Sequence, residues 1–183
     1  MEIAVVNELA TRLAGTIRDV VDFPKEGIVF KDITTLCKDA EAFAASVSAM
    51  AEPFRGSGVE QIVAAESRGF IFGAAMAVEL GCGFVPVRKP GKLPAETVRV
   101  DYELEYGSDT LEMHLDAVEP GQKVLLVDDL LATGGTMGAV LEMVRGRGGE
   151  VVGASFLIEL TFLPGRSRLP DVDVHTVIRV DAE

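Results

Sequence analysis

The segment from Val124 to Thr136, VLLVDDLLATGGT, constrains the fold more than any other part of the chain. Its first four residues form a continuous apolar run, which is typical of a strand buried on both faces of a parallel sheet. Asp128 and Asp129 follow directly, so we expect both carboxylates at the carboxyl end of this strand. Beyond a loop, apolar residues recur at helical spacing from Met137 to Val144. The segment therefore predicts a strand, a loop that binds a ligand, and a helix.

The loop comprises five small or hydroxyl-bearing residues: Ala132, Thr133, Gly134, Gly135 and Thr136. Such residues let the backbone approach an anion closely, and the free N–H groups of the following helix favour a phosphate. An ATP-type P-loop has a lysine after its glycines to reach the outer phosphates, whereas this loop continues with Thr136 and Met137, so a monophosphate fits better. The alternative is that this is an ordinary glycine-containing turn between a strand and a helix, as α/β proteins commonly have. The paired carboxylates favour a ligand site, because they repel each other unless solvent, a cation or a ligand compensates.

The apolar segments alternate between strand-like and helix-like patterns along the chain. Strands are predicted at Gln61–Ala65, Gly83–Val87, Lys123–Val127, Val151–Ile158 and Val172–Val180. Helices are predicted over Val6–Ile17, Phe43–Phe54 with Asp39 as cap, Ile71–Val78 with Ala74 and Ala75 on its apolar face, and Met137–Val144. This alternation predicts an α/β fold with a parallel sheet covered by helices, and ligands at the carboxyl ends of the strands.

The composition excludes several classes of protein. The 183 residues, 48% of them hydrophobic, suit one domain, and the net charge of −12 would repel a nucleic-acid backbone. The N-terminal residues carry no cationic signal region, and nowhere do about 18 apolar residues run together, so we expect neither secretion nor a membrane partner. Cys37 and Cys82 form no metal or disulfide motif, which favours a reducing, cytoplasmic location.

The segment VLLVDDLLATGGT resembles the phosphoribosyl diphosphate signature of the type I phosphoribosyltransferases. Its residues are most similar to those of the adenine-specific members. Four more segments agree, in that family's order and with similar spacing: FPKEGIVFKDIT at 23–34, ESRGF at 66–70, RKPGKLP at 88–94 and LEYG at 104–107. The resemblance covers nearly the whole chain, residues 1–183. It implies a type I phosphoribosyltransferase fold, with a mostly parallel central sheet flanked by helices, a small hood at about residues 20–36 and a flexible flap at about 90–107.

The resemblance assigns the phosphate and sugar contacts. Residues 132–136 would bind the 5′-phosphate of the donor, and Asp128 and Asp129 would bind its ribose hydroxyls. Mg²⁺ would be held mainly by the donor, with water-mediated contacts to either aspartate and no direct protein ligand.

Two basic segments are candidates for pyrophosphate. Ser67 and Arg68 follow a predicted strand and open a helix, so Arg68 is placed to direct forked donors at an oxygen pair. Arg88, Lys89 and Lys92 gather three cations in five residues of an acidic chain. From the residues alone, a solvated arginine near a turn is the favoured interpretation of Arg68, and a solvated turn is an alternative for the basic cluster. The family assigns both to pyrophosphate, and implies that Arg88 serves the neighbouring site of a homodimer.

Residues 90–107 contain two prolines, two glycines and mixed charge, which suits a long mobile flap more than a packed element. Such a lid would exclude water from an oxocarbenium-like sugar. The resemblance assigns proton exchange with the purine to Glu105, beside Tyr106. Without the resemblance, the sequence favours the interpretation of Glu105 as an exposed charge in an acidic strand.

The segment from Phe23 to Thr34 predicts a small hairpin or flap, which the family uses as a hood over the base. Phe30 would stack on a purine, and backbone groups around Ile28 and Lys31 would read its edge. Leu131 would form the opposite wall. Simple core burial is the alternative for Phe30.

Together these features predict magnesium-dependent transfer of 5-phosphoribosyl from 5-phosphoribosyl 1-diphosphate to N9 of adenine, giving AMP and pyrophosphate. Two alternatives stay open: a xanthine- or guanine-specific relative, and a non-catalytic regulator that senses the donor. The acidic charge, and an N-terminal segment too short for a winged helix, disfavour the regulator.

Overall fold

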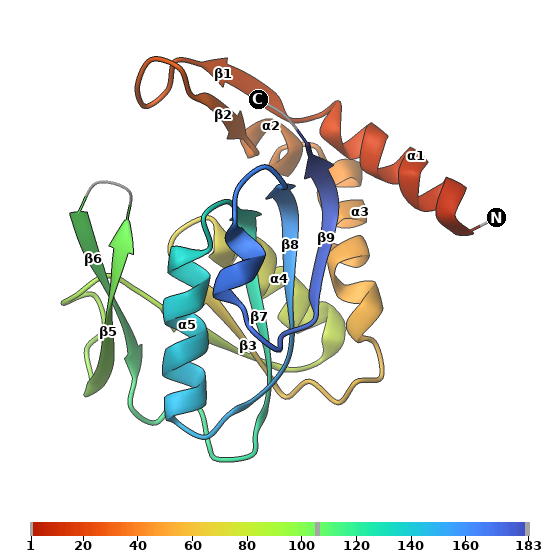
Figure 1. Cartoon of the computed structure of the whole chain (residues 1–183). Coiled ribbons are helices and arrows are strands. Elements are labelled where there is room, and N and C mark those ends of the chain that lie inside the picture. Colours follow the sequence, from red (N-terminus) through yellow and green to blue (C-terminus); the bar gives the residue numbers. More distant parts are fainter. Residues whose placement is uncertain (1, 105–106, 182–183) are drawn as a thin grey trace.

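A computed structural model describes residues 2–104 and 107–181, and within them the central element is a parallel sheet of five strands (Figure 1). The strands lie in the order β4-β3-β7-β8-β9. Their bounds are β3 (Gln61–Ala65), β4 (Gly83–Val87), β7 (Lys123–Leu131), β8 (Glu150–Leu160) and β9 (Val174–Val180). The predicted parallel sheet is therefore confirmed.

Helices cover both faces of this sheet (Figure 1). They are α1 (Glu2–Ala14), α2 (Thr34–Cys37), α3 (Ala40–Ala51), α4 (Gly69–Leu80) and α5 (Gly135–Gly146), with 3₁₀ turns η1 (Glu52–Phe54) and η2 (Gly165–Arg168). Side chains of β7 alternate between the two cores: Val124 and Leu126 join the cluster with α5, whereas Leu125 and Val127 join the cluster with α3 and α4. Burial on both faces explains why this strand reads as a continuous apolar run.

Local hydrogen bonds mark two of the helix ends. The side chain of Asp39 caps α3 by accepting hydrogen bonds from the N–H groups of Glu41 and Ala42, both at 3.0 Å, as predicted. Helix α1 ends at Ala14 instead of Ile17, because the chain turns back through a hydrogen bond from the Ile17 N–H to the Ala14 oxygen.

The apolar face predicted for the helix after β3 is wrong, although the helix itself is confirmed. Ile71 and Val78 of α4 are 40% and 85% exposed. The face that packs on the sheet consists instead of Phe72, Gly73, Met76 and Ala77. Helix α4 is apolar nearly all round, so spacing alone did not identify its buried side.

The hood predicted near residues 20–36 is a hairpin. Strands β1 (Arg18–Val21) and β2 (Val29–Asp32) pair antiparallel, with Val20 opposite Phe30. The carboxylate of Asp22 accepts a hydrogen bond from the Gly27 N–H at 2.9 Å within the connecting turn. A small hairpin is thus present, but its first strand lies before the predicted segment Phe23–Thr34.

The flap is more regular than expected. Strands β5 (Thr97–Leu104) and β6 (Gly107–His114) pair antiparallel over their full lengths. Val98 and Val100 pack against the core that contains Leu111 and Met113, which are 2% and 0% exposed. The expectation of a flap without packed elements is therefore wrong for residues 97–104, where alternating valines form a strand. Glu105 and Tyr106 lie outside the described residues.

Replacing Phe156 with Ala is expected to destabilise the fold by about 3–5 kcal/mol, because this ring is fully buried in β8 and its loss leaves a cavity. Phe162→Ala is the matched control, since that ring is 39% exposed and its loss should cost less than about 1 kcal/mol. Chemical denaturation of both variants measures the difference. Equal losses would contradict the placement of Phe156.

Candidate active site

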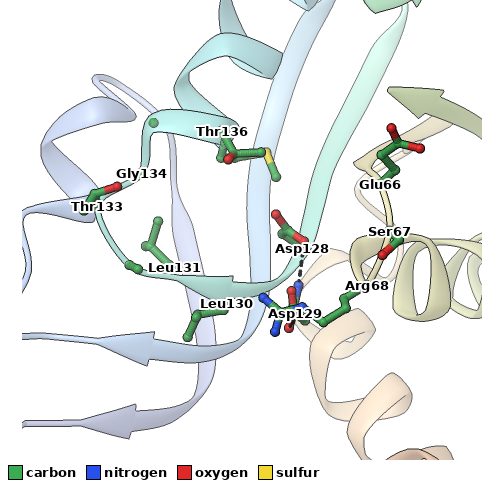
Figure 2. Close-up of a pocket in the computed structure, with 13 residues that line it drawn as sticks. Glu66, Ser67, Arg68, Asp128, Asp129, Leu130, Leu131, Thr133, Gly134 and Thr136 are labelled. Carbon is green, nitrogen blue, oxygen red and sulfur yellow. Dashed lines mark hydrogen bonds and ion pairs between the residues drawn. The ribbon is translucent and has the colours of Figure 1, made fainter. Parts of the chain in front are cut away.

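The site lies where the strand order of the sheet reverses. Strand β3 is followed along the chain by its neighbour β4 on one side, and later by its neighbour β7 on the other. The loops after β3 and β7 therefore diverge and leave a crevice at their carboxyl ends, which is where ligands bind in such sheets. The pocket in Figure 2 is lined there by Glu66, Ser67, Arg68 and the continuous segment 128–137.

Strand β7 is longer than predicted. Its pairing with β3 ends at Val127, whereas its pairing with β8 continues to Leu131. Asp128 and Asp129 therefore lie within the strand but beyond its last pair with β3. This difference in length exposes the edge of β7 to the loop at Glu66–Arg68.

The two aspartates are held by different partners. Asp129 is 3% exposed and forms an ion pair with Arg68, whose Nε lies 3.0 Å from Oδ2. Asp128 accepts a hydrogen bond from the Asp129 N–H at 3.0 Å. A Cβ atom at Gly69 would lie 2.7 Å from Oδ1 of Asp128, so the carboxylate packs on the first residue of α4, where its charge meets the positive helix end.

Both carboxyl groups have raised pKa values. Burial is the largest cause for each, and the charge of Asp129 further raises the pKa of Asp128. The guanidinium of Arg68 opposes the rise in the pKa of Asp129. One arginine thus faces two partly desolvated carboxyls, an arrangement that would be relieved by a cation or by hydroxyl donors.

The loop that follows has the backbone shape of an anion site. Gly134 adopts φ +78° and caps α5, which starts at Gly135. Because Gly134 carries no side chain to cap the helix, the first N–H groups of α5 remain available to a ligand. Thr133 and Thr136 line the same pocket (Figure 2). The structure therefore brings the predicted phosphate loop and both aspartates into one site.

The predicted pyrophosphate residues fall into two groups. Ser67 and Arg68 line the pocket, and the Glu66–Ser67 peptide bond is cis. Arg88 and Lys89 are not among the residues that line the pocket, but both bind the carboxylate of Glu66, which is. The Nε of Arg88 lies 2.8 Å from Oε2 of Glu66, and the Lys89 N–H donates to Oε1 at 2.7 Å.

A second carboxylate, missed in the sequence, holds this basic turn. Glu112 is 1% exposed; its Oε2 accepts a hydrogen bond from the Gly91 N–H at 3.0 Å, and its Oε1 lies 2.6 Å from Nε of Arg99. Lys89 also pairs with Asp109 of β6 at 3.0 Å. The basic turn, which includes Lys92, is thus tied to the hairpin that leads to Glu105. The sequence signal for this role is the position of Glu112 between two apolar residues, Leu111 and Met113.

Apolar side chains from the hood and α4 form an adjacent pocket. It is lined by Val20, Phe23, Phe30, Asp32, Ile33, Thr34, Arg68 and Ile71. The Phe30 ring contacts the Phe23 ring edge-on at 5.1 Å, and the guanidinium carbon of Arg68 lies 5.0 Å from the Phe30 ring centroid. Arg68 therefore joins the carboxylate site to the hood.

The polar groups named in the hood have partners within the hairpin. The N–H of Ile28 donates to the Lys25 oxygen and its oxygen accepts from the Phe23 N–H, both at 3.3 Å. The ammonium of Lys31 pairs with Asp19 at 2.8 Å.

Leu131, predicted as a wall for the base, lines the pocket at the end of β7. Its side chain is 1% exposed and packs in the core with α5. The preceding residue, Leu130, is partly exposed, lines the pocket, and points toward the opposite core, which includes Ile33 of the hood side. Leu130 and Leu131 thus both line the pocket, and they pack into opposite cores.

Comparison with known proteins agrees with this geometry. The family model described as "Phosphoribosyl transferase domain" matches residues 36–181. The chain belongs to the phosphoribosyltransferase family. Its fold is the type I phosphoribosyltransferase fold predicted from the sequence.

Relatives of known name lie close within this family. An adenine phosphoribosyltransferase from Acidobacterium capsulatum is 58% identical over 91% of this chain and 92% of its own. The crystal structure of adenine phosphoribosyltransferase from Thermoanaerobacter pseudethanolicus superposes with a TM-score of 0.91 at 53% identity, covering 93% of this chain and 99% of that one. The Saccharomyces cerevisiae enzyme, complexed with an imino-altritol bisphosphate and adenine, superposes with a TM-score of 0.88 at 39% identity, over 94% and 99% of the two chains.

Within residues 2–104 and 107–181, no helix is long and apolar enough to cross a membrane. The same residues contain no cluster of three or more His, Cys, Asp or Glu side chains placed to hold a metal ion.

Asp128→Asn is expected to stabilise the ligand-free protein by about 0.5–2 kcal/mol at pH 8, because it removes one of two crowded charges from a functional site. The raised pKa of Asp128 sets the sign of the pH dependence: the wild-type carboxyl takes up a proton as pH falls, so the advantage of Asn should shrink toward pH 5. Thermal melts from pH 5 to 8 measure it.

The exposed Asp116 supplies the control, and Asp116→Asn should change stability by less than about 0.5 kcal/mol. A loss of stability in Asp128→Asn at pH 8 would mean that the hydrogen bond from Asp129 and the end of α4 outweigh the cost of burial.

Proposed function

We propose that this protein transfers the 5-phosphoribosyl group of 5-phosphoribosyl 1-diphosphate to N9 of adenine, forming AMP and pyrophosphate and so salvaging the free base. The observation that carries the proposal is the pair of aspartates followed by a helix-capping glycine loop at the reversal point of the sheet. The relatives named adenine phosphoribosyltransferase, which match over nine-tenths of the chain, support adenine as the acceptor.

The donor is bound by three parts of the chain. The N–H groups and hydroxyls of residues 133–136 hold the 5′-phosphate at the positive end of α5. Asp128 and Asp129 accept hydrogen bonds from the ribose hydroxyls. Their charges also stabilise the positive charge that develops at C1′ as the bond to pyrophosphate breaks.

The leaving pyrophosphate requires cations. Ser67 and Arg68 face the pocket and supply donors at the start of α4. Arg88, Lys89 and Lys92 lie on the basic turn, residues 88–92, which is held by Glu66 and Glu112. This turn lies behind Glu66 and does not line the pocket itself. This position suits contact with a neighbouring subunit's donor as well as with its own.

The residues present fit magnesium bound with the donor. Two desolvated carboxyls share one arginine, so Asp128 and Asp129 would hold Mg²⁺ through its water shell while the donor supplies the direct ligands. When bound, the ion would neutralise the diphosphate and make it a better leaving group.

Adenine would lie in the apolar pocket of the hood, stacked between Phe30 and Leu130. The guanidinium of Arg68 occupies one side of the Phe30 ring in the ligand-free protein. Backbone groups at Ile28 and Lys31 would read the edge of the base, and Glu105 would exchange a proton with its imidazole side, beside Tyr106.

We also propose a cytoplasmic homodimer. Ile71, Ala74 and Val78 form an exposed apolar stripe at helical spacing on α4, and a second copy of the chain would cover it. Two free cysteines and the strongly acidic surface fit a reducing compartment without a nucleic-acid partner. The mass of the protein in solution tests the dimer.

The decisive assay follows AMP formation from the donor and magnesium with adenine, hypoxanthine, guanine or xanthine. We expect adenine-selective turnover, reduced at least about 100-fold in kcat by Glu105→Ala because general acid–base catalysis contributes about that much. Glu119→Ala serves as control, because Glu119 is exposed and lines neither the carboxylate pocket nor the hood pocket. Turnover of a 6-oxopurine instead would favour a xanthine or guanine enzyme, and donor binding without turnover of any base would favour a regulator.

A further inference from the structure

A buried carboxylate, Glu159, lies beside the phosphate loop but is not among the residues that line the pocket. Glu159 of β8 is 4% exposed, and in the sheet register it lies opposite Leu131 of β7 and Arg179 of β9. It is therefore a direct neighbour of the residue that ends β7 and begins the phosphate loop.

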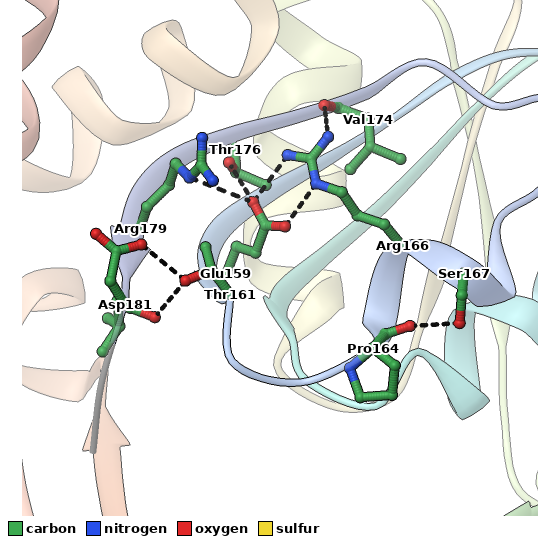
Figure 3. Close-up of polar contacts among 10 residues, drawn as sticks. Glu159, Thr161, Pro164, Arg166, Ser167, Val174, Thr176, Arg179 and Asp181 are labelled. Carbon is green, nitrogen blue, oxygen red and sulfur yellow. Dashed lines mark hydrogen bonds and ion pairs between the residues drawn. The ribbon is translucent and has the colours of Figure 1, made fainter.

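Both oxygens of this carboxylate are paired with one arginine from η2. The Nε and Nη2 of Arg166 lie 2.5 and 2.8 Å from the two oxygens of Glu159, which is a bidentate pair (Figure 3). Thr176 donates a further hydrogen bond at 3.0 Å, whereas Arg179 stands off at 4.0 Å. The hydrogen bond from Arg166 is the largest cause that lowers the pKa of Glu159, so the carboxyl is ionised at neutral pH.

The remaining donor of Arg166 ties the same turn to β9. Its Nη1 donates to the backbone oxygen of Val174 at 3.1 Å (Figure 3). One guanidinium thus links η2 to the ends of β8 and β9. Since the fork is planar and rigid, it fixes the orientation of η2 as well as its distance.

Turn η2 in turn lies directly against the phosphate loop. A Cβ atom at Gly134 would lie 2.4 Å from the backbone oxygen of Gly165, and one at Gly165 would lie 2.4 Å from the oxygen of Ala132. Arg168 Cβ is a further 3.0 Å neighbour of the Gly134 position. The two backbones are in van der Waals contact with no side chain between them, so a shift of η2 displaces the loop directly.

We propose that the Glu159–Arg166 pair is a positioning device that holds the phosphate loop in its anion-binding shape through η2, and thereby sets affinity for the 5′-phosphate of donor and product. This inference rests on the proposed function for the identity of the ligand. Neither residue lines the pocket among the described residues, so both act through the backbone contact between Gly165 and the loop.

The test measures binding of AMP by calorimetry in the whole protein, together with KM for the donor and for adenine. Glu159→Gln keeps the size of the side chain but loses one acceptor and the charge. We expect AMP Kd and donor KM to rise about 10- to 100-fold, as a misplacement of up to about 1 Å would produce, with adenine KM within twofold. Arg179→Gln is the matched control, because it removes the distant partner of the same carboxylate and leaves η2 untouched.

Arg166→Lys provides a second route if Glu159→Gln folds poorly, since Arg166 is half exposed and Lys retains the charge without the fork. It should show the same selective loss for AMP and donor at an unchanged melting temperature. Unchanged AMP affinity in either folded variant, or an equal loss for AMP and adenine, would overturn the proposal. Absence of AMP formation in the wild type would contradict the proposed function, whereas the ratio of AMP affinities would still report on the loop.

Discussion

Strand β7 pairs with its two neighbours over unequal lengths, and the whole site depends on this difference. Four residues past the last pair with β3, the strand still pairs with β8, so one edge stays open. Asp128 and Asp129 present polar groups there, Leu130 turns toward the hood, and Leu131 is fixed in the core. The strand thus places two carboxylates, Leu130 and the start of the glycine loop on one rigid element beside the pocket.

The site contains several groups that lower the free energy of unfolding of the protein. Two carboxyls with raised pKa values share Arg68, and the glycines at positions 69, 134 and 165 allow contacts that a Cβ atom would block. Carboxylates farther out serve to hold cations in place: Glu66 and Glu112 fix the basic turn, and Glu159 fixes Arg166. In this acidic chain, several carboxylates thus hold arginine side chains in fixed positions around the pocket.

The sequence predicted features that depend on neighbouring residues. The apolar run 124–127, the cap at Asp39 and the loop at 132–136 each carry a local signal, and the structure contains all three elements. It failed where the outcome depends on distant partners. The buried side of α4 and the hairpin of β5 and β6 are set by packing and register. The pairing of Glu159 with Arg166 also follows from the tertiary fold, since nothing in their spacing indicates that they meet around η2.

A crystal structure with AMP bound would test the central claim, that the loop after β7 is the 5′-phosphate site. The account predicts the phosphate within hydrogen-bonding distance, about 2.7–3.2 Å, of the N–H groups at residues 133–136, with the ribose hydroxyls against Asp128 and Asp129 and the adenine ring between Phe30 and Leu130. A phosphate bound at the basic turn of Arg88–Lys92, with the loop at 132–136 empty, would contradict it.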